Sequence, residues 1–431
     1  MTVYAGGLVF QQVFGIKELW GIDFFWIAAI GLVVLTALYT IFGGMKSVLY
    51  TSVLQTPILL LGSLIILVLG FKELGGWDEM MRVCGAVTVN DYGDTMTNLI
   101  RSNDDANFPW LGALIGSAII GFWYWCTDQF IVQRVLSGKN EKEARRGTIF
   151  GAYLKLLPVF LFLIPGMIAF ALHQKYIGAG GEGFLPMLAN GTANADAAFP
   201  TLVAKLLPAG VKGLVVCGIL AALMSSLASL FNSSAMLFTI DFYKRFRPET
   251  PEKKLVGIGQ IATVVIVILG ILWIPIMRSV GDVLYTYLQD VQSVLAPGIA
   301  AAFLLGICWK RTSAQGGMWG LIAGMIIGLT RLGAKVYYSN AGEVADSTFK
   351  YLFYDMNWLF FCGWMFLFCI IVVIVVSLAT EAPTAEKIQG LVFGTATKEQ
   401  KAATRASWDH WDIIHTVIIL AITGAFYWYF W

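Results

Sequence analysis

The stretch GLVVCGILAALMSSLASLFNSSAMLFTI, residues 213–240, contains no charged side chain. A helix needs about 20 apolar residues to cross ~30 Å of hydrocarbon, so this stretch is long enough to span a membrane. It is not uniformly apolar, because Ser225, Ser229, Asn232 and Ser233 recur at intervals of three or four residues. That spacing places polar groups on one side of a helix. The stretch therefore predicts a membrane-spanning helix with one polar stripe.

The same apolar character extends along the whole chain. Of its 431 residues, 58% are hydrophobic and 13% are charged, whereas a soluble protein has about 25% charged residues. Continuous apolar runs favour helices over the alternating strands of a membrane barrel. We therefore predict an all-α polytopic membrane protein, with a short apolar segment near residues 3–15 and ten full spans. The spans are expected near residues 22–41, 52–71, 109–128, 148–172, 211–240, 255–276, 283–306, 315–334, 358–379 and 411–431.

Basic residues distinguish the two sides of the predicted topology. The loops 129–147 and 241–254 each carry five Lys or Arg side chains and fall on one side, together with the segment 380–410. The long loops 72–108 and 174–210 fall on the other side. Short cytoplasmic loops are enriched in Lys and Arg. We therefore expect the basic loops to be cytoplasmic in an inner (plasma) membrane, with the C-terminus outside and 380–410 as a cytoplasmic connector.

Charge and residue usage exclude several functions. A formal net charge of +2 gives no basic surface of the kind that binds nucleic acid. The six cysteines include no CxxC pair, and the three histidines are scattered, so we expect no zinc cluster and no nucleophile–histidine pair. We therefore expect that the protein is not an enzyme, binds no organic cofactor and has no obligate protein partner.

The polar stripe of residues 213–240 has two interpretations. Serine hydroxyls near backbone carbonyls suit a hard cation, which is held by oxygen. Serine and alanine also let helices approach closely in a membrane. The pattern alone favours this packing interpretation.

An aromatic segment, WYWCTDQ at residues 123–129, ends another predicted span. Its rings could stack on a ligand or form a gate, but aromatic residues also collect at ordinary membrane interfaces. Composition alone favours the interface. Asp128 is harder to explain in this way, although Arg134 could neutralise it at the membrane edge.

Two further polar groups lie within predicted spans, where such residues are costly. Lys155 could extend back to the surface or donate hydrogen bonds into a cavity. A second group combines Gln289, Asp290, Gln292 and Ser293 and is followed by Pro297, which removes a helical hydrogen bond. It predicts either a cavity wall beside a kink or hydrogen bonding between helices. Four polar groups in one chain favour a solute pathway.

Several ordered strings resemble the sodium/solute symporter family, most closely its sodium/glucose cotransporter branch. They are ALYTIFGG (37–44), WYWCTDQFIVQR (123–134), MSSLASLFNS (224–233), FTIDFY (238–243) and AFLLGICWKR (302–311). The resemblance implies a leucine-transporter-like core of two inverted five-helix repeats, with site helices broken near the midplane. It also implies Na⁺ as the coupling ion and a small sugar as the solute.

The resemblance assigns roles to residues of this chain. The Ala222 carbonyl and the hydroxyls of Ser225 and Ser226 would be sodium ligands. Lys155 and Gln289 would bind sugar hydroxyls. Tyr124 would lie against the sugar ring as an inner gate, with Trp123 and Trp125 on either side of it.

The sequence departs from the family pattern in three places. Ser52 stands where the family usually has an aspartate associated with cations, which predicts one sodium per sugar. Gly121 stands where sugar transporters often have a polar side chain. Met1 aligns inside the family's fourth helix, so the first repeat is expected to be incomplete and the 431-residue chain is not expected to transport by itself.

We therefore expect a remnant of the first repeat at 1–71, an extracellular loop at 72–108, the second repeat at 109–306 and three additional helices at 307–431. The predicted function is sodium-coupled uptake of a monosaccharide, such as glucose or galactose, by alternating access. The alternatives are a symporter for inositol or another small polar solute, and a non-transporting sensor or structural module on the same fold.

Overall fold

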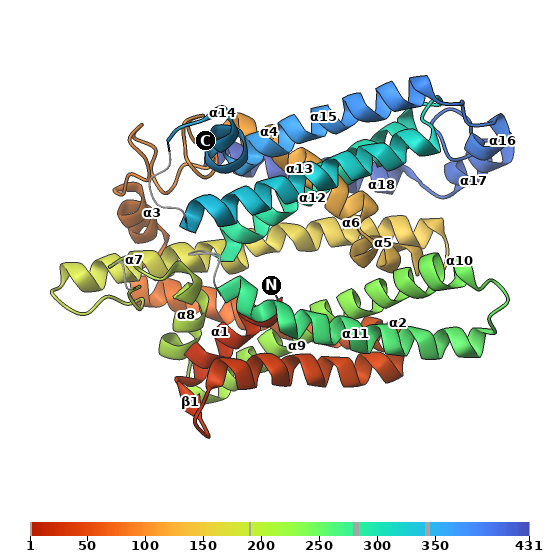
Figure 1. Cartoon of the computed structure of the whole chain (residues 1–431). Coiled ribbons are helices and arrows are strands. Elements are labelled where there is room, and N and C mark those ends of the chain that lie inside the picture. Colours follow the sequence, from red (N-terminus) through yellow and green to blue (C-terminus); the bar gives the residue numbers. More distant parts are fainter. Residues whose placement is uncertain (1, 189–190, 279–283, 341–344, 431) are drawn as a thin grey trace. The chain divides into compact units, whose positions relative to one another are not determined.

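Helices form nearly all of the secondary structure in the computed structural model, which describes residues 2–188, 191–278, 284–340 and 345–430 (Figure 1). Within these residues the only paired strands are the hairpin β1 (Glu18–Leu19) and β2 (Ile22–Asp23). The longer α-helices are α1 (Thr2–Phe14), α2 (Phe24–Leu74), α4 (Trp110–Phe122), α6 (Glu141–Pro158), α7 (Ile164–Gly178), α9 (Ala209–Met236), α11 (Glu252–Arg278), α12 (Leu284–Cys308), α13 (Ala314–Asn340), α15 (Trp358–Ala379) and α18 (His410–Tyr429). The shorter α-helices are α3 (Trp77–Gly85), α5 (Gln129–Leu136), α8 (Ala198–Leu206), α10 (Lys244–Phe246), α14 (Thr348–Lys350), α16 (Ala385–Ile388) and α17 (Lys398–Ala406). The π and 3₁₀ segments are η1 (Trp123–Thr127), η2 (Val159–Leu163), η3 (Ala195–Ala197), η4 (Leu237–Tyr243) and η5 (Tyr351–Asp355).

The ten predicted spans are confirmed. The described residues contain 10 helical segments that are long and apolar enough to cross a membrane, and each overlaps one predicted span. The largest differences are at Glu141–Gly178 and Ala209–Phe246, which extend beyond the predicted 148–172 and 211–240. Residues 283 and 431 of the predicted spans lie outside the described residues. The first two, Phe24–Gly43 and Val48–Leu74, both lie within α2. The short segment expected near residues 3–15 forms α1.

The chain divides into two compact units. Unit 1 comprises residues 1–89, 95–97 and 154–284. Unit 2 comprises residues 90–94, 98–153 and 285–431. These units follow the packing of the chain and do not test the predicted repeat boundaries, which stay a prediction.

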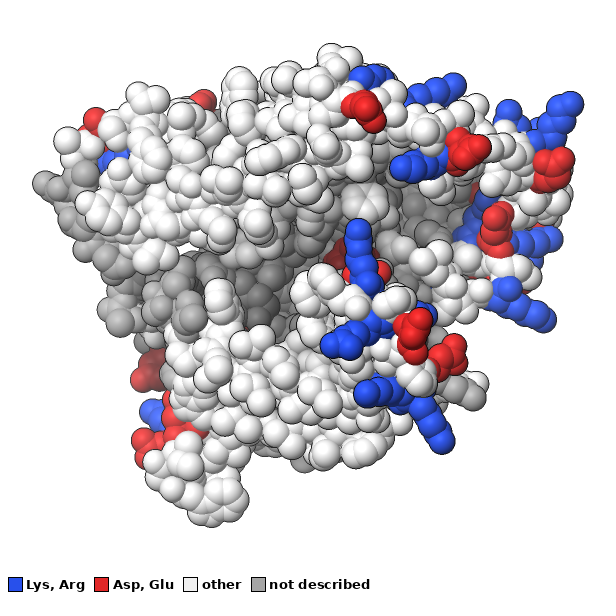
Figure 2. Space-filling model, turned by 45° about the vertical axis from the view of Figure 1, so that its right-hand side comes forward, with Lys and Arg blue, Asp and Glu red and all other residues white. Residues whose placement is uncertain are grey.

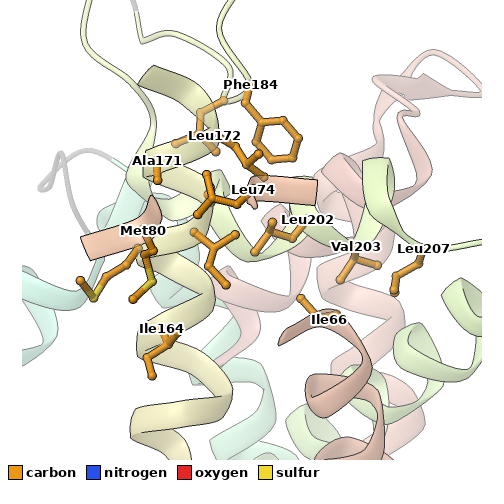
Figure 3. Packing of buried hydrophobic residues seen from close by; sticks show 14 of the residues in the cluster. Ile66, Leu74, Met80, Ile164, Ala171, Leu172, Phe184, Leu202, Val203 and Leu207 are labelled. Carbon is orange, nitrogen blue, oxygen red and sulfur yellow. The ribbon is translucent and has the colours of Figure 1, made fainter. Parts of the chain in front are cut away.

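Unit 1 is held together by packing of α2 along α9 and by a cluster of buried apolar side chains. Figure 3 shows Ile66 and Leu74 of α2 gathered with Leu172 of α7 and Leu202 of α8. All four are 2% exposed or less. The cluster joins segments from the two ends of unit 1's sequence, which explains why they form one body.

Unit 2 depends on close approach between helices. Glycines recur every fourth residue on α13, at Gly316, Gly320, Gly324 and Gly328. A Cβ atom at Gly316 or Gly320 would clash with the α15 side chains of Ser377 or Val373. One at Gly324 would lie 3.0 Å from the Cα of Gly298 on α12, and one at Gly328 would lie 2.8 Å from the Val294 carbonyl oxygen. This glycine stripe lets three helices meet backbone to backbone, as small residues do in membranes.

The molecular surface also fits a membrane protein. On the face drawn in Figure 2, most of the described surface is white, and the Lys, Arg, Asp and Glu side chains gather in a few places. Large apolar side chains are exposed along the spans, including Leu61, Leu269 and Leu329. Such continuous apolar surface is rare on soluble proteins and is suited to contact with lipid.

The connector predicted at 380–410 is partly helical. It contains α16 and α17. Helix α17 begins with a capping box in which the side chains of Thr397 and Gln400 satisfy each other's backbone N–H groups.

Substituting Gly328 with alanine should destabilise unit 2, because the added Cβ would lie against a backbone oxygen that cannot move aside cheaply. Overpacking of this kind costs about 1–3 kcal/mol. Thermal unfolding in detergent measures the effect. Gly317→Ala is the matched control, since nothing lies within 4 Å of its added Cβ on the same helix. Equal stability of the two variants would contradict the assigned role of the glycine stripe.

Candidate functional site

Two helices of unit 1 bring serine hydroxyls together. Ser225 lies near the middle of α9, and its Oγ is 2.6 Å from the Oγ of Ser52 on α2. The Ser52 hydroxyl also donates to the carbonyl oxygen of Val48 at 2.8 Å. A hydroxyl has one proton, so Ser225 is the donor in the serine pair. Its own oxygen is left with lone pairs that can accept from or coordinate another group.

The three predicted sodium ligands share a face of α9. Ala222, Ser225 and Ser226 occupy positions i, i+3 and i+4 of a continuous helix. All three residues are half-buried. The structure therefore brings the predicted ligand set together within one unit.

The remaining serines of the stripe have a different role. The Ser229 hydroxyl donates to the Ser225 carbonyl at 3.0 Å, and the Ser233 hydroxyl donates to the Leu230 carbonyl at 3.1 Å. Both residues are buried. Hydroxyls bonded to their own helix in this way fit the packing interpretation for Ser229 and Ser233.

A tyrosine that the sequence did not single out as a functional residue fixes α2 against α9. The Tyr39 hydroxyl donates to the Met224 carbonyl at 2.8 Å. Tyr39 is therefore anchored directly beside Ser225. The contact joins residues 185 positions apart, and no local pattern in the sequence indicates it.

The aromatic segment at 123–127 forms the π-helix η1. The rings of Tyr124 and Trp125 meet edge to face with centroids 5.2 Å apart, and those of Trp123 and Tyr124 are 6.1 Å apart. The π-helical segment ends at Asp128, whose backbone is extended and whose side chain accepts from the Phe130 N–H at the start of α5. π-Helical turns occur frequently at functional sites. This turn lies at the end of the span Trp110–Thr127, so the break near the midplane that the resemblance implies stays a prediction.

Burial raises the pKa of the Asp128 carboxyl above its usual value, although the hydrogen bond from Phe130 opposes that shift. Desolvation disfavours the charged form of a carboxyl group. Asp128 caps α5, so its part in the structure is established by geometry and needs no ligand.

The five predicted sugar contacts fall in different units. Lys155 is exposed on α6 within unit 1. Trp123, Tyr124, Trp125 and Gln289 lie in unit 2. Their joint role in a binding site therefore stays a prediction.

The polar residues at 289–293 differ in their partners, since one bonds within α12 and another pairs with α13. Ser293 is fully buried, and its hydroxyl donates to the Asp290 carbonyl at 2.6 Å. The Asp290 carboxylate pairs with Arg331 and Lys335 of α13. The sequence pattern did not single out either cation. A charged residue inside a predicted span is itself the signal that could have found Arg331.

Comparison with known proteins identifies the family. A model described as "Sodium:solute symporter family" matches residues 1–324. The chain belongs to the sodium:solute symporter family. Members of this family are transporters, so the prediction that the chain is not an enzyme is confirmed. With its 10 candidate spans, it is a multi-pass membrane protein.

Two curated relatives show the branch of the family. The sodium/mannose cotransporter of Bos taurus is 34% identical over 451 residues, which cover 100% of this chain and 74% of that protein. Sodium/myo-inositol cotransporter 2 of Homo sapiens is 35% identical over 406 residues, which cover 92% of this chain and 59% of that protein. The chain thus spans between about three fifths and three quarters of the length of these relatives.

A solved structure shows the same fold. A Na⁺-coupled sialic acid symporter in an outward-open state matches with a TM-score of 0.65 at 20% sequence identity, covering 89% of this chain and 73% of that chain. The predicted fold class, a helical membrane protein with a leucine-transporter-like core, is therefore confirmed.

Proposed function

We propose that the protein couples sodium entry to the uptake of a small polyhydroxylated solute, a monosaccharide or an inositol. The observation that carries the proposal is the oxygen set on α9. Ala222, Ser225 and Ser226 share one face of a membrane span. The Ser225 hydroxyl donates its proton to Ser52, and its oxygen keeps lone pairs that can coordinate a cation. Oxygen ligands are what a hard cation requires. Membership of a sodium:solute symporter family supports this assignment.

The solute class follows from the relatives. They are named for mannose, myo-inositol and, in Mus musculus, glucose. All three solutes are six-membered rings that carry several hydroxyl groups. We assign Lys155 and Gln289 to hydroxyl recognition and Tyr124 to the ring face, with Trp123 and Trp125 beside it.

The transport mechanism is alternating access. Sodium and solute bind from outside, the repeats rock, and the gate at η1 opens inward. The basic loops 129–147 and 241–254 set the orientation in a plasma membrane, with the C-terminus outside.

The stoichiometry depends on Ser52. A second sodium ion near Ser225 needs compensating negative charge, because a buried cation without it is costly. The hydroxyl of Ser52 supplies none, and its proton is engaged with the Val48 carbonyl. We therefore assign one sodium ion per solute molecule.

Replacing Ser226 with alanine should abolish sodium dependence of uptake, because it removes a ligand oxygen. Ser229→Ala is the matched control on the same helix, since the Ser229 hydroxyl is bonded to the Ser225 carbonyl and should matter far less. Uptake of labelled mannose, glucose and myo-inositol by cells expressing the full-length protein, in sodium or in choline, measures both. Absence of sodium-dependent uptake for every solute in the unsubstituted protein would overturn the proposed function.

Substituting Ser52 with aspartate should recruit a second ion, because it places a carboxylate beside Ser225. The expected change is a rise in the Hill coefficient for sodium from about one toward two, with a matching shift in reversal potential. Ser52→Asn is the control of equal size without charge. A ratio of two sodium ions per solute in the unsubstituted protein would contradict the assignment to Ser52.

Replacing Lys155 or Gln289 with alanine should weaken solute affinity to different extents. Loss of a hydrogen bond from a charged donor costs about 1.5–3 kcal/mol, and loss of a neutral one about 0.5–1.5 kcal/mol. Lys155→Ala should therefore have the larger effect on the solute concentration for half-maximal uptake. An unchanged affinity in Lys155→Ala would mean that this lysine only extends to the membrane surface.

A further inference from the structure

A buried charge cluster lies one residue away from the predicted sugar contact Gln289. Asp290 of α12 has its Oδ1 3.4 Å from Nη2 of Arg331 and its Oδ2 2.5 Å from Nζ of Lys335. Arg331 and Lys335 are four residues apart on α13, so they lie on the same face of that helix. The Asp290–Arg331–Lys335 cluster therefore joins α12 to α13 through charge-assisted hydrogen bonds, which are stronger than neutral ones.

Arg331 extends the connection to two further elements. Its side chain is 0% exposed. Nη2 donates to the Met356 carbonyl at 2.8 Å, just after η5, and the guanidinium carbon lies 4.0 Å from the ring centroid of Phe361 on α15. One side chain thus fixes α12, η5 and α15 to its own helix, α13.

Packing alone does not explain this cluster. Replacing a buried ion pair with apolar side chains of similar volume is often neutral or stabilising, and charged groups within membrane spans are typically functional. What paired charges supply is a defined geometry, because both partners must keep their positions. The question is which part of the molecule needs that geometry.

The part of α12 before Pro297 is the segment that most requires a fixed geometry. Pro297 lacks an N–H group, so it cannot donate to the carbonyl four residues earlier, at Ser293. The helical bonding of α12 is weakened at that point, between Gln289 and the rest of the helix. The contacts of Asp290 with Arg331 and Lys335 lie before Ser293 in the sequence. There they can fix how the first part of α12 is rotated about its own axis.

We propose that Asp290 is a positioning residue for solute recognition, which acts by holding Gln289 in place through Arg331 and Lys335. Successive residues on a helix are about 100° apart. Fixing the side chain at 290 against α13 therefore fixes the direction in which residue 289 projects. The proposal rests on the proposed function in that it takes Gln289 as a solute contact.

A double-substitution cycle tests whether Asp290 acts through Gln289. Asp290→Asn alone should raise the KM for solute uptake about 3- to 10-fold, the equivalent of losing a neutral hydrogen bond, with kcat per transporter at the surface little changed. In the Gln289→Ala background the same substitution should add no further rise. The proposal would be overturned if the KM increases of the two single variants multiplied in the double variant, or if Asp290→Asn left KM unchanged. Neither result would affect the conclusion that uptake depends on sodium.

Lys335→Met provides a milder variant in case Asp290→Asn does not fold. It removes one partner of Asp290 and leaves Arg331 paired. It should raise KM less than Asp290→Asn, and again only when Gln289 is present. A rise that persists in the Gln289→Ala background would count against the proposal.

A second measurement does not depend on transport. Gln289→Cys is introduced after the exposed cysteines Cys126, Cys217 and Cys308 are replaced, and its rate of labelling by a small maleimide is followed. Adding Asp290→Asn should change that rate several-fold, whereas Leu305→Cys, on the other side of Pro297, should label at an unchanged rate. An unchanged rate at position 289 would overturn the positioning role. The two proposals can fail separately. If the unsubstituted protein shows no sodium-dependent uptake but Asp290→Asn still changes the labelling rate of Gln289→Cys, the proposed function is wrong, whereas the positioning of residue 289 by Asp290 is supported.

Discussion

Hydrocarbon offers no hydrogen-bond partners, so every polar group within a span must be satisfied by the protein itself. Several hydroxyls in the described part of unit 1 meet this requirement by donating to their own helix, as Thr36 does to Leu32, Thr40 to Thr36 and Thr263 to Gly259. Ser225 meets it differently, because its proton is directed to the hydroxyl of Ser52 on another helix. The same constraint therefore joins α2 to α9 beside the proposed sodium ligands, at a hydroxyl whose oxygen keeps its lone pairs.

The positions of the spans could be predicted from the sequence because hydrocarbon thickness sets their length. The span expected at 358–379 is α15, Trp358–Ala379. The serine spacing on α9 could be recognised because it lies within one helix, whereas the role of these residues as sodium ligands comes from the family resemblance and stays a prediction. The pairing of Ser52 with Ser225 could not be predicted, since 173 residues separate them and only tertiary packing brings them together. Arg331 was missed because it is a single charge in an otherwise apolar, glycine-rich span.

Both units pack large buried side chains against one another. In unit 1 these include Ile66 and Leu172, and in unit 2 they include Ile120 and Leu359. The glycine stripe of α13 adds a second means in unit 2, since the absence of side chains brings the backbones themselves into contact. Apolar lipid gives helices no hydrophobic reason to associate, and both solutions therefore depend on the complementarity of shape between neighbouring surfaces.

On α12 and α13 the glycine stripe and the charge cluster form one continuous seam. Gly298, Val294 and Asp290 follow each other at four-residue steps along α12, and they meet Gly324, Gly328 and Arg331 of α13 in reverse order. Backbone contact fixes the separation of the helices where side chains are absent. At Asp290 and Arg331, where the side chains are long, charge pairing fixes the separation of the two helices instead. Because the seam continues on both sides of Pro297, α13 supports α12 on both sides of the point where the helical bonding at Ser293 is weakened.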